Sequence, residues 1–243
     1  MDAEARRAKA QWVETKLEEF YGSRPYDPAI YESDLLGALI ATILSQHTSD
    51  LNSGRAYAAL KAAYPMGWDY VRAAPVEQIA DAIRCGGLAA VKAARIKRLL
   101  QDICARTGAT HLDFLRDLTS DEEIALFLTS FHGVGPKTAA CILLFNLGRP
   151  AIPVDTHVHR VSRRIGLVGP KADAVKTQNE LKLLVAPSQA YSFHVHLIEH
   201  GRRICHAQRP SCGRCPVSAR CCYFQLDRGI EPEKGAQKRR TAA

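Results

Sequence analysis

Residues 131–155 restrict the possible folds more than any other stretch of this 243-residue chain, because they contain two closely spaced helix starts. The stretch reads FHGVGPKTAACILLFNLGRPAIPVD. Gly133 and Gly135 flank Val134 in a predicted tight turn, where glycine tolerates positive φ and lets backbone N–H groups approach another molecule closely. Pro136 then begins a helix, a position at which its missing N–H costs nothing. The turn therefore joins two predicted helices.

Two helices joined by GVG are typical of a helix-hairpin-helix motif, here over about residues 123–148. Backbone amides at a helix start bind phosphate, because the unpaired N–H groups and the helix dipole both favour an anion. Lys137 lies in the first turn of the second helix, and Asp155 is the predicted N-cap of the next one. The dipole disfavours an ammonium and favours a carboxylate. We therefore expect Lys137 to be a neutral, nucleophilic amine and Asp155 an ionised base or charge stabiliser.

The apolar periodicity is helical along the chain, and no stretch alternates like a half-buried strand. The fold class is therefore predicted to be all-α. On the helix predicted near 90–106, the pattern places Lys92 with Arg95 on the charged side, opposite the apolar residues. Ser120 is expected to cap the first helix of the hairpin. The other helices are predicted at 3–21, 34–44, from 49 or 50 to 64, 76–84, 136–147, near 171–185 and near 188–200.

The formal net charge of +8 suits a polyanionic partner, although a basic enzyme unrelated to nucleic acid has a similar balance. Aromatic residues are few, which argues against a stacking platform for single strands. No apolar run approaches the length of a membrane span, so no membrane partner is expected. The N-terminal segment lacks the apolar core of a signal peptide. We expect an intracellular protein, cytoplasmic and nucleoid-associated if it is bacterial.

Eight cysteines are divided unevenly along the chain. Cys85, Cys104 and Cys141 lie in helical, apolar settings and are predicted to fill the core. The other five lie between residues 205 and 222. For an intracellular chain this asymmetry indicates a metal or cluster site rather than a disulfide framework.

The clustered cysteines follow the spacing x6-x2-x5 and supply four thiolates: Cys205, Cys212, Cys215 and Cys221. Tetrahedral sulfur ligation suits zinc or an iron–sulfur cluster, and the spacing alone leaves both open. Cys222 is a competing fourth ligand. Arg209, between the first two cysteines, is a candidate contact to DNA phosphate, with solvated surface charge as the alternative.

The GVGPK hairpin, the aspartate 18 positions after the lysine, and the cysteine spacing together resemble endonuclease III, a helix-hairpin-helix DNA glycosylase and abasic-site lyase. The resemblance covers about residues 1–226. It implies a four-iron–four-sulfur (4Fe-4S) cluster on the four cysteines. It also implies a six-helix barrel domain at 29–149 and a helical cluster domain formed by 1–28 and 150–226. Residues 227–243 are polar and basic and are predicted to form a disordered tail.

Two further segments are similar to this family. LSQHTSD resembles the family's LSAQATD, and Gly87-Leu88 resembles the start of its GLYNSKA segment. In the family these loops insert a glutamine and a leucine into the duplex where the damaged nucleotide leaves. Leu88 matches, but the glutamine position falls on His47, with Gln46 beside it. The polar residues after the family leucine are here replaced by Ala-Ala-Val at 89–91.

The resemblance implies a bifunctional enzyme of base excision repair, a DNA N-glycosylase and DNA-(apurinic or apyrimidinic site) lyase that removes oxidised pyrimidines. Its partner would be double-stranded DNA with damaged bases or abasic sites, bound by a monomer. Lys137 would be the nucleophile, Asp155 would stabilise charge, and the amides of Gly133, Val134 and Gly135 would hold a phosphate. A lysine after GVG, taken alone, also suits a simple phosphate contact. The alternatives are an adenine-type glycosylase, which usually lacks the lysine, and a non-catalytic DNA-binding module with a structural metal.

Overall fold

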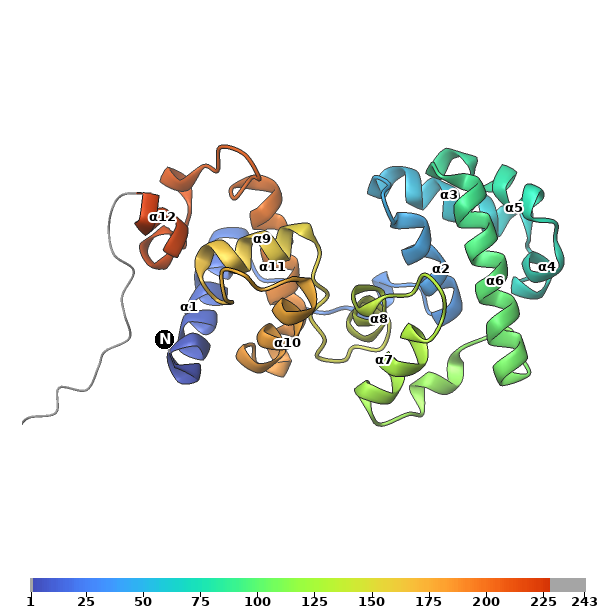
Figure 1. Ribbon diagram of the computed structural model, residues 1–243, viewed down its shortest axis with the longest axis horizontal. Helices are drawn as coiled ribbons and strands as arrows, with labels where there is room; N and C mark the ends of the chain where they lie inside the picture. Colours follow the sequence, from blue (N-terminus) through green and yellow to red (C-terminus); the bar gives the residue numbers. More distant parts are fainter. Residues whose placement is uncertain (1, 228–243) are drawn as a thin grey trace, which may run out of the picture. The chain divides into compact units, whose positions relative to one another are not determined.

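The computed structural model describes residues 2–227, and within that range it contains helices and turns but no strand. The chain forms two compact units (Figure 1). One combines Met1–Tyr26 with Pro150–Ala243, and the other consists of Asp27–Arg149. The sequence places these boundaries after residues 28 and 149. We call the two parts the terminal unit and the central unit and describe each by itself.

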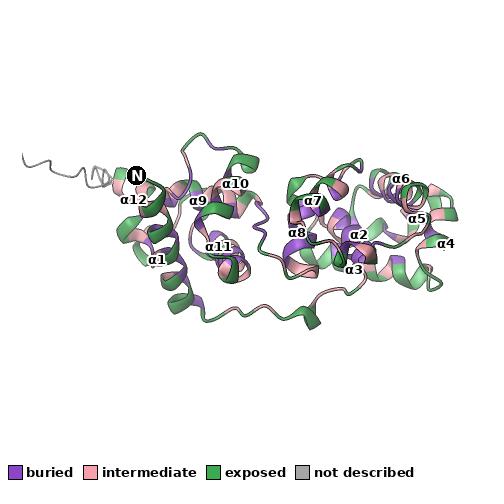
Figure 2. Ribbon diagram, turned by 90° about the horizontal axis from the view of Figure 1, so that it is seen from below, coloured by how far each residue is buried: buried purple, intermediate pink, exposed green. Residues whose placement is uncertain are grey.

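The central unit is built around α2 (Leu35–Ser45), an apolar helix in which Leu35 to Ile40, Ile43 and Leu44 are buried. Asp34 caps it by accepting a hydrogen bond from the amide of Leu36 at 3.0 Å. Figure 2 shows buried residues concentrated on α2 and α8. A helix that is apolar on all sides needs neighbours on all sides. The main neighbours of α2 are α3 (Asp50–Ala63), α6 (Ala89–Thr107), α8 (Pro136–Cys141) and the π-helix Ile142–Asn146. The unit also contains α4 (Trp68–Ala73) and α5 (Val76–Ala82), which pack on α6, and α7 (Asp121–Thr129), which packs on α8, with short 3₁₀ turns at Pro28–Ile30, Arg84–Gly86 and Asp113–Arg116.

The terminal unit brings the two ends of the described chain together. Its first helix, α1 (Ala3–Tyr21), packs on α10 (Ala174–Leu184) and α11 (Ala190–Arg203). The remaining helices are α9 (Thr156–Ile165) and α12 (Cys222–Asp227). A 3₁₀ turn at Pro187–Gln189 lies between α10 and α11, and two more, Cys212–Arg214 and Ser218–Arg220, lie between α11 and α12. Figure 1 shows the blue α1 and the orange α11 side by side. The unit therefore depends on contacts between residues more than 150 positions apart.

Several sequence predictions need correction. The helix predicted at 136–147 is α-helical only to Cys141, because Ile142–Asn146 is a π-helix. A short helix, α4, was not expected, since it starts at Gly67 with no side-chain cap. Lys92 is 3% exposed and lies in the interior, so it is not on the charged side of α6. Cys85 is exposed, whereas Cys141 is buried as predicted.

Two remaining expectations concern membranes and the tail. Among the described residues, no helix is both long enough and apolar enough to cross a membrane. The tail predicted at 227–243 lies outside the described residues, except for Asp227, which ends α12.

Candidate DNA-processing site and cysteine centre

The hairpin between α7 and α8 has the predicted glycine turn. Gly133 has a φ of 84°, a left-handed conformation that favours glycine. Val134 is buried, and its amide donates to the carbonyl of Phe131 at 3.1 Å, which closes the turn. Gly135 is the N-cap of α8 and provides no side-chain cap. The first amides of α8 therefore have the arrangement that suits an anion.

A residue that the sequence did not single out fixes this turn to the 45–49 loop, the residues that follow α2. Arg95 donates from Nη1 to Oε1 of Gln46 at 2.6 Å, and Nε2 of Gln46 reaches the carbonyl of Gly133 at 3.4 Å. A side chain at Gly133 would meet Cδ of Arg95 at 2.5 Å, so the close approach requires glycine. The structure thus brings together Gln46 and the hairpin. The sequence pattern placed Arg95 on the charged side of α6, and no local signal links it to Gln46.

His47 and Leu88 share an unusual backbone conformation. Their φ values are 53° and 51°, and both side chains are exposed, Leu88 to 58%. A non-glycine residue at positive φ is strained by about 1–3 kcal/mol and persists only where its surroundings enforce it. Among the described residues only one further non-glycine residue has a positive φ, and that is Arg209, at 48°. All three were predicted from the sequence to contact DNA.

Lys137 and Asp155 begin successive helices but belong to different units. Lys137 is exposed in the first turn of α8, where its amine is accessible to a substrate. Asp155 is half-buried, and its Oδ1 accepts a hydrogen bond from the amide of Val158 at 2.7 Å. It is therefore the N-cap of α9, as predicted. The second carboxylate oxygen leaves Asp155 with acceptor capacity beyond the cap.

The four predicted ligand cysteines line a single cavity in the terminal unit. Burial above all, and then the neighbouring thiols, raise the pKa of Cys215 to about 12, and burial also raises the pKa of Cys221. Such mutual influence requires the thiols to be close together. Cys222, the competing ligand, lies outside this cavity, and its Sγ accepts from Nζ of Lys9 at 3.5 Å. The rest of the cavity is formed by Arg164, Ile165, His200, Ile204, Pro210, Val217, Ser218, Tyr223 and Phe224.

Four thiols around one cavity suit either a tetrahedral ion such as zinc or an iron–sulfur cluster, and their arrangement alone leaves both open. Within residues 2–227, no group of three potential ligands is placed so as to hold a metal ion.

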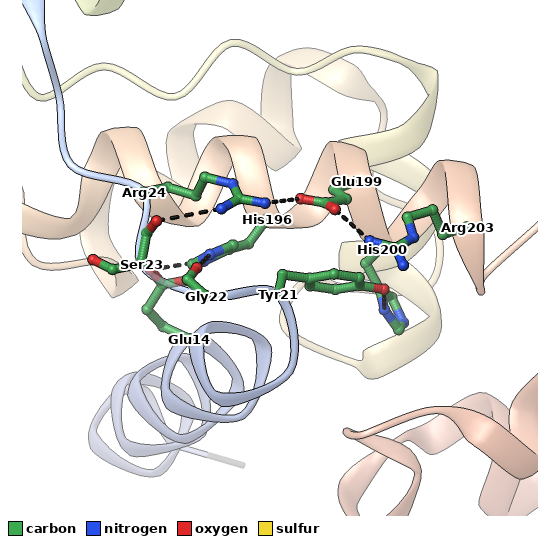
Figure 3. A network of polar contacts seen from close by, with 9 residues as sticks. All are labelled: Glu14, Tyr21, Gly22, Ser23, Arg24, His196, Glu199, His200 and Arg203. Carbon is green, nitrogen blue, oxygen red and sulfur yellow. Dashed lines mark hydrogen bonds and ion pairs between the residues drawn. The ribbon is translucent and has the colours of Figure 1, made fainter.

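Polar groups around the cavity are directed at the sulfur atoms. Nη1 of Arg164 lies 3.5 Å from Sγ of Cys205, and Nε2 of His200 lies 3.5 Å from Sγ of Cys215. Hydrogen-bond donors of this kind stabilise thiolate ligands. The orientation of His200 is fixed from the opposite side, because its Nδ1 lies 3.0 Å from the hydroxyl of Tyr21 on α1 (Figure 3). The residues present therefore fit a thiolate-bound group.

The protonation of this pair is set by burial. Desolvation raises the pKa of Tyr21 to about 12 and lowers the pKa of His200 to about 4. Both side chains are therefore neutral near pH 7. In the tautomer that carries its proton on Nε2, His200 donates toward Sγ of Cys215 while Nδ1 accepts from the hydroxyl of Tyr21. The one signal of this role in the sequence is the position of His200, five residues before Cys205.

Comparison with known proteins relates this geometry to a family. Residues 40–187, more than half of the chain, match the model of the HhH-GPD superfamily of base excision DNA repair proteins. The chain belongs to the HhH-GPD superfamily. This confirms the all-α fold, the predicted family and the enzyme class, a DNA glycosylase that acts in base excision repair.

Individual relatives agree with this membership. The chain is 42% identical over 171 residues to a protein of Arabidopsis thaliana provisionally named a DNA glycosylase, and the match covers 70% of this chain and 58% of the plant protein. It thus spans less than two thirds of that relative. It is 33% identical over 194 residues to endonuclease III of Thermotoga maritima, covering 80% of this chain and 85% of the other. A solved structure of an endonuclease III–DNA complex has the same fold, with a TM-score of 0.76 at 24% identity over 92% of this chain and 98% of that one.

Proposed function

We propose that this protein is a bifunctional DNA glycosylase and abasic-site lyase that removes oxidised pyrimidines from duplex DNA. The observation that carries the proposal is Lys137, an exposed amine in the first turn of α8 immediately after the glycine hairpin. A glycosylase that activates water stops at the abasic site, whereas an amine nucleophile also permits strand cleavage. An intracellular location, with a monomer bound to damaged DNA, is part of the proposal.

The reaction begins with extrusion of the damaged nucleotide, because a stacked base is out of reach of an enzyme. Oxidised pyrimidines stack poorly, so their extrusion costs less than that of an intact base. The amides of Gly133 and Gly135 and the start of α8 hold a phosphate of the damaged strand and fix its register. His47 and Leu88, exposed and held in the left-handed conformation, occupy the space that the nucleotide leaves.

Nζ of Lys137 then attacks C1′ of the sugar, and the bond between C1′ and the base breaks. Asp155 stabilises the positive charge that develops on the sugar and receives the proton of the lysine. The sugar ring then opens as the C1′–O4′ bond breaks and O4′ takes up a proton, and the Schiff base that forms between C1′ and Nζ acidifies C2′. Loss of a C2′ proton and cleavage of the C3′–O bond release the strand 3′ to the lesion and leave an unsaturated sugar on the lysine, which water hydrolyses.

Cys205, Cys212, Cys215 and Cys221 are proposed to hold a 4Fe-4S cluster. When bound, the cluster fastens the loop after α11 to the rest of the terminal unit. Support comes from the shared cavity and from the donors on Arg164 and His200. Arg209, exposed between the first two cysteines, is proposed to contact DNA phosphate from this loop.

The test is covalent trapping. The purified protein is incubated with duplex DNA that contains thymine glycol, and borohydride is added to reduce any Schiff base. We expect a covalent protein–DNA band that disappears completely in Lys137→Ala. A band that persists in this variant would refute the nucleophile. If the protein is trapped only on duplex DNA that contains an abasic site, the lyase activity is supported and thymine glycol is rejected as a substrate. If it is trapped on neither DNA, the protein is a water-using glycosylase or a DNA-binding module.

A further inference from the structure

Lys92 is a buried cation with no assigned role. It lies near the start of α6 and is 3% exposed. Its Nζ donates to the carbonyl of Leu44 at 2.6 Å and to that of Gly86 at 3.0 Å. A third hydrogen bond, at 2.5 Å, goes to Oγ1 of Thr48. An ammonium has three donors and no acceptor, so these partners satisfy it completely.

The acceptors come from two separate parts of the central unit. Leu44 lies in the last turn of α2, where unpaired carbonyls and the negative end of the helix dipole favour a cation. Thr48 belongs to the 45–49 loop, which follows this helix. Gly86 belongs to the 84–88 turn, defined here as the residues that lead into α6. The hydroxyl of Thr48 also donates to the carbonyl of Gly86 at 2.7 Å, so the two segments are joined directly as well as through the lysine.

Each of these segments displays one of the strained, exposed residues. His47 is the neighbour of Thr48, and Leu88 lies two residues after Gly86. The left-handed conformation of both residues needs surroundings that enforce it. The ammonium of Lys92 supplies such surroundings at the base of both segments at once.

We propose that Lys92 is a positioning residue that locks the 45–49 loop to the 84–88 turn, so that His47 and Leu88 enter a DNA duplex as one rigid unit. The inference rests on the proposed function, because it assigns a purpose to the insertion step. Two side chains on independent loops would have to be ordered during insertion, whereas linked loops are ordered beforehand. The lock therefore lowers the entropic cost of opening the duplex.

Simple stabilisation is a poor explanation for this cation. Burial and the nearby guanidinium of Arg95 lower the pKa of Lys92, which shows that its charge is held in an unfavourable place. Replacing buried charges by apolar residues of similar size is often neutral or stabilising for a fold. A buried ammonium that links two strained segments is better explained by the geometry it imposes than by the stability it adds.

The first experiment needs no DNA. Amide hydrogen exchange is compared between the wild type and Lys92→Met, a substitution of similar length that removes all three donors. We expect faster exchange in peptides covering 45–49 and 84–88, and unchanged protection in the middle of α2. Lys97→Met is the matched control, because Lys97 lies on the same helix but donates to the carbonyl of Ala74, outside both segments. The proposal is overturned if these peptides exchange at the wild-type rate in Lys92→Met, or if they exchange equally fast in Lys97→Met.

The second experiment separates insertion from chemistry. Borohydride trapping is measured on an abasic site in a duplex and on the same site in a single-stranded oligonucleotide. We expect Lys92→Met to lose about 100-fold in rate on the duplex, the usual effect of a misplaced group, and to retain its rate on the single strand, where no duplex has to be opened. An equal loss on both substrates contradicts the positioning role.

A failure of the proposed function remains distinguishable from a failure of this inference. If the wild type traps neither abasic substrate, the lyase proposal fails, while the exchange data still decide whether Lys92 locks the two segments. If Lys92→Met does not fold, Thr48→Val replaces it in both experiments. That variant keeps the ammonium and removes only the shared hydroxyl, so a smaller loosening of the same two segments is expected, and wild-type exchange there counts against the lock.

Discussion

The interiors of the two units differ in chemistry. In the central unit, the buried polar side chains are Ser53, Lys92 and Thr138. The terminal unit is smaller within the described range but buries more of them: Lys9, Glu14, Ser162, Thr177, His194, His196 and His200. The central unit is therefore held by apolar packing around α2. The terminal unit depends on the polar partners of Lys9, Glu14 and the buried histidines, and buried polar groups are costly when their partners are lost.

The pair of Glu14 and His196 shows how the terminal unit is held. Nδ1 of His196 lies 3.1 Å from a carboxylate oxygen of Glu14, and its Nε2 lies 3.0 Å from the carbonyl of Gly22 (Figure 3). Both partners are acceptors, so both ring nitrogens carry protons. The hydroxyl of Ser192 also donates to Glu14. Together these contacts attach α1 to α11.

The difference separates function from stability in a testable way. The proposed nucleophile and the inserted residues lie on the surface of a core that does not depend on them. The cysteines lie inside a unit whose interior is polar. Substitutions of these exposed residues of the central unit should therefore reduce activity with little effect on folding, whereas substitutions of the cysteines and buried polar residues of the terminal unit should reduce stability first.

The largest effect is expected for Cys215→Ser, if the proposed cluster is present. Losing a ligand of a structural metal group belongs to the few single changes that cost more than about 4 kcal/mol. Hydrogen exchange should show lost protection in α1, α9 and α11, with α2 and α6 protected as before, and iron content should fall. An equal loss of protection in both units would contradict the proposal that the cysteines stabilise the terminal unit alone. Cys104→Ser, outside the cavity, serves as the control.

A smaller effect, about 3 kcal/mol, is expected for His196→Gln, because the carboxylate of Glu14 would stay buried without its cation. Burial lowers the pKa of His196, but its hydrogen bonds with Glu14 and Gly22 outweigh this and raise it above its ordinary value. Because the folded-state pKa is raised, protonated His196 contributes its full stabilisation below about pH 6.5. This contribution is lost as the pH rises through the pKa of His196 in the folded protein.

Thermal unfolding of the wild type and His196→Gln, measured across this pH range, tests whether the stabilisation by His196 decreases as the pH rises. The difference in melting temperature should be greatest in acid and shrink as the solution becomes alkaline. His111→Gln is the control, because the side chain of His111 is 56% exposed beside Asp113. A difference that grows with pH would show that His196 is neutral in the folded protein.

The smallest change in stability, about 1 kcal/mol, is expected for Asp155→Ala, which removes an N-cap. Asp155→Asn should preserve the cap and the stability, yet lose activity in the trapping assay because the charge is gone. Asp173→Ala provides a matched comparison, since Asp173 caps α10 in the same way, with a 2.7 Å bond from the amide of Lys176. Full activity of Asp155→Asn would refute the charge-stabilising role.

Local signals made most of the helices predictable. Ser49, Ser120 and Asp155 were expected to begin helices, and each accepts a hydrogen bond from an amide of the first turn. These caps act within three residues, so the sequence contains the whole interaction. The hairpin glycines and the cysteine spacing were likewise recognisable because they are local patterns.

The errors concern interactions across long distances in the chain. Lys92 was assigned to the charged side of α6, because nothing near it shows that Leu44 lies within reach of its ammonium. Arg95 was missed as a link between Gln46 and the hairpin for the same reason. The π-helix at Ile142–Asn146 follows an unbroken apolar run, and no residue in it breaks the α-helical pattern.

The construction of the terminal unit from both ends of the chain has a consequence during protein synthesis. The central unit is complete once residue 149 has left the ribosome, and it can fold while translation continues. By contrast, α1 is made before the central unit but lacks its partner until α11 follows, because Glu14 and His196 lie 182 positions apart. This helix is thus synthesised before the central unit and packed only after it, so its buried polar groups stay without their partners while all the residues in between are made.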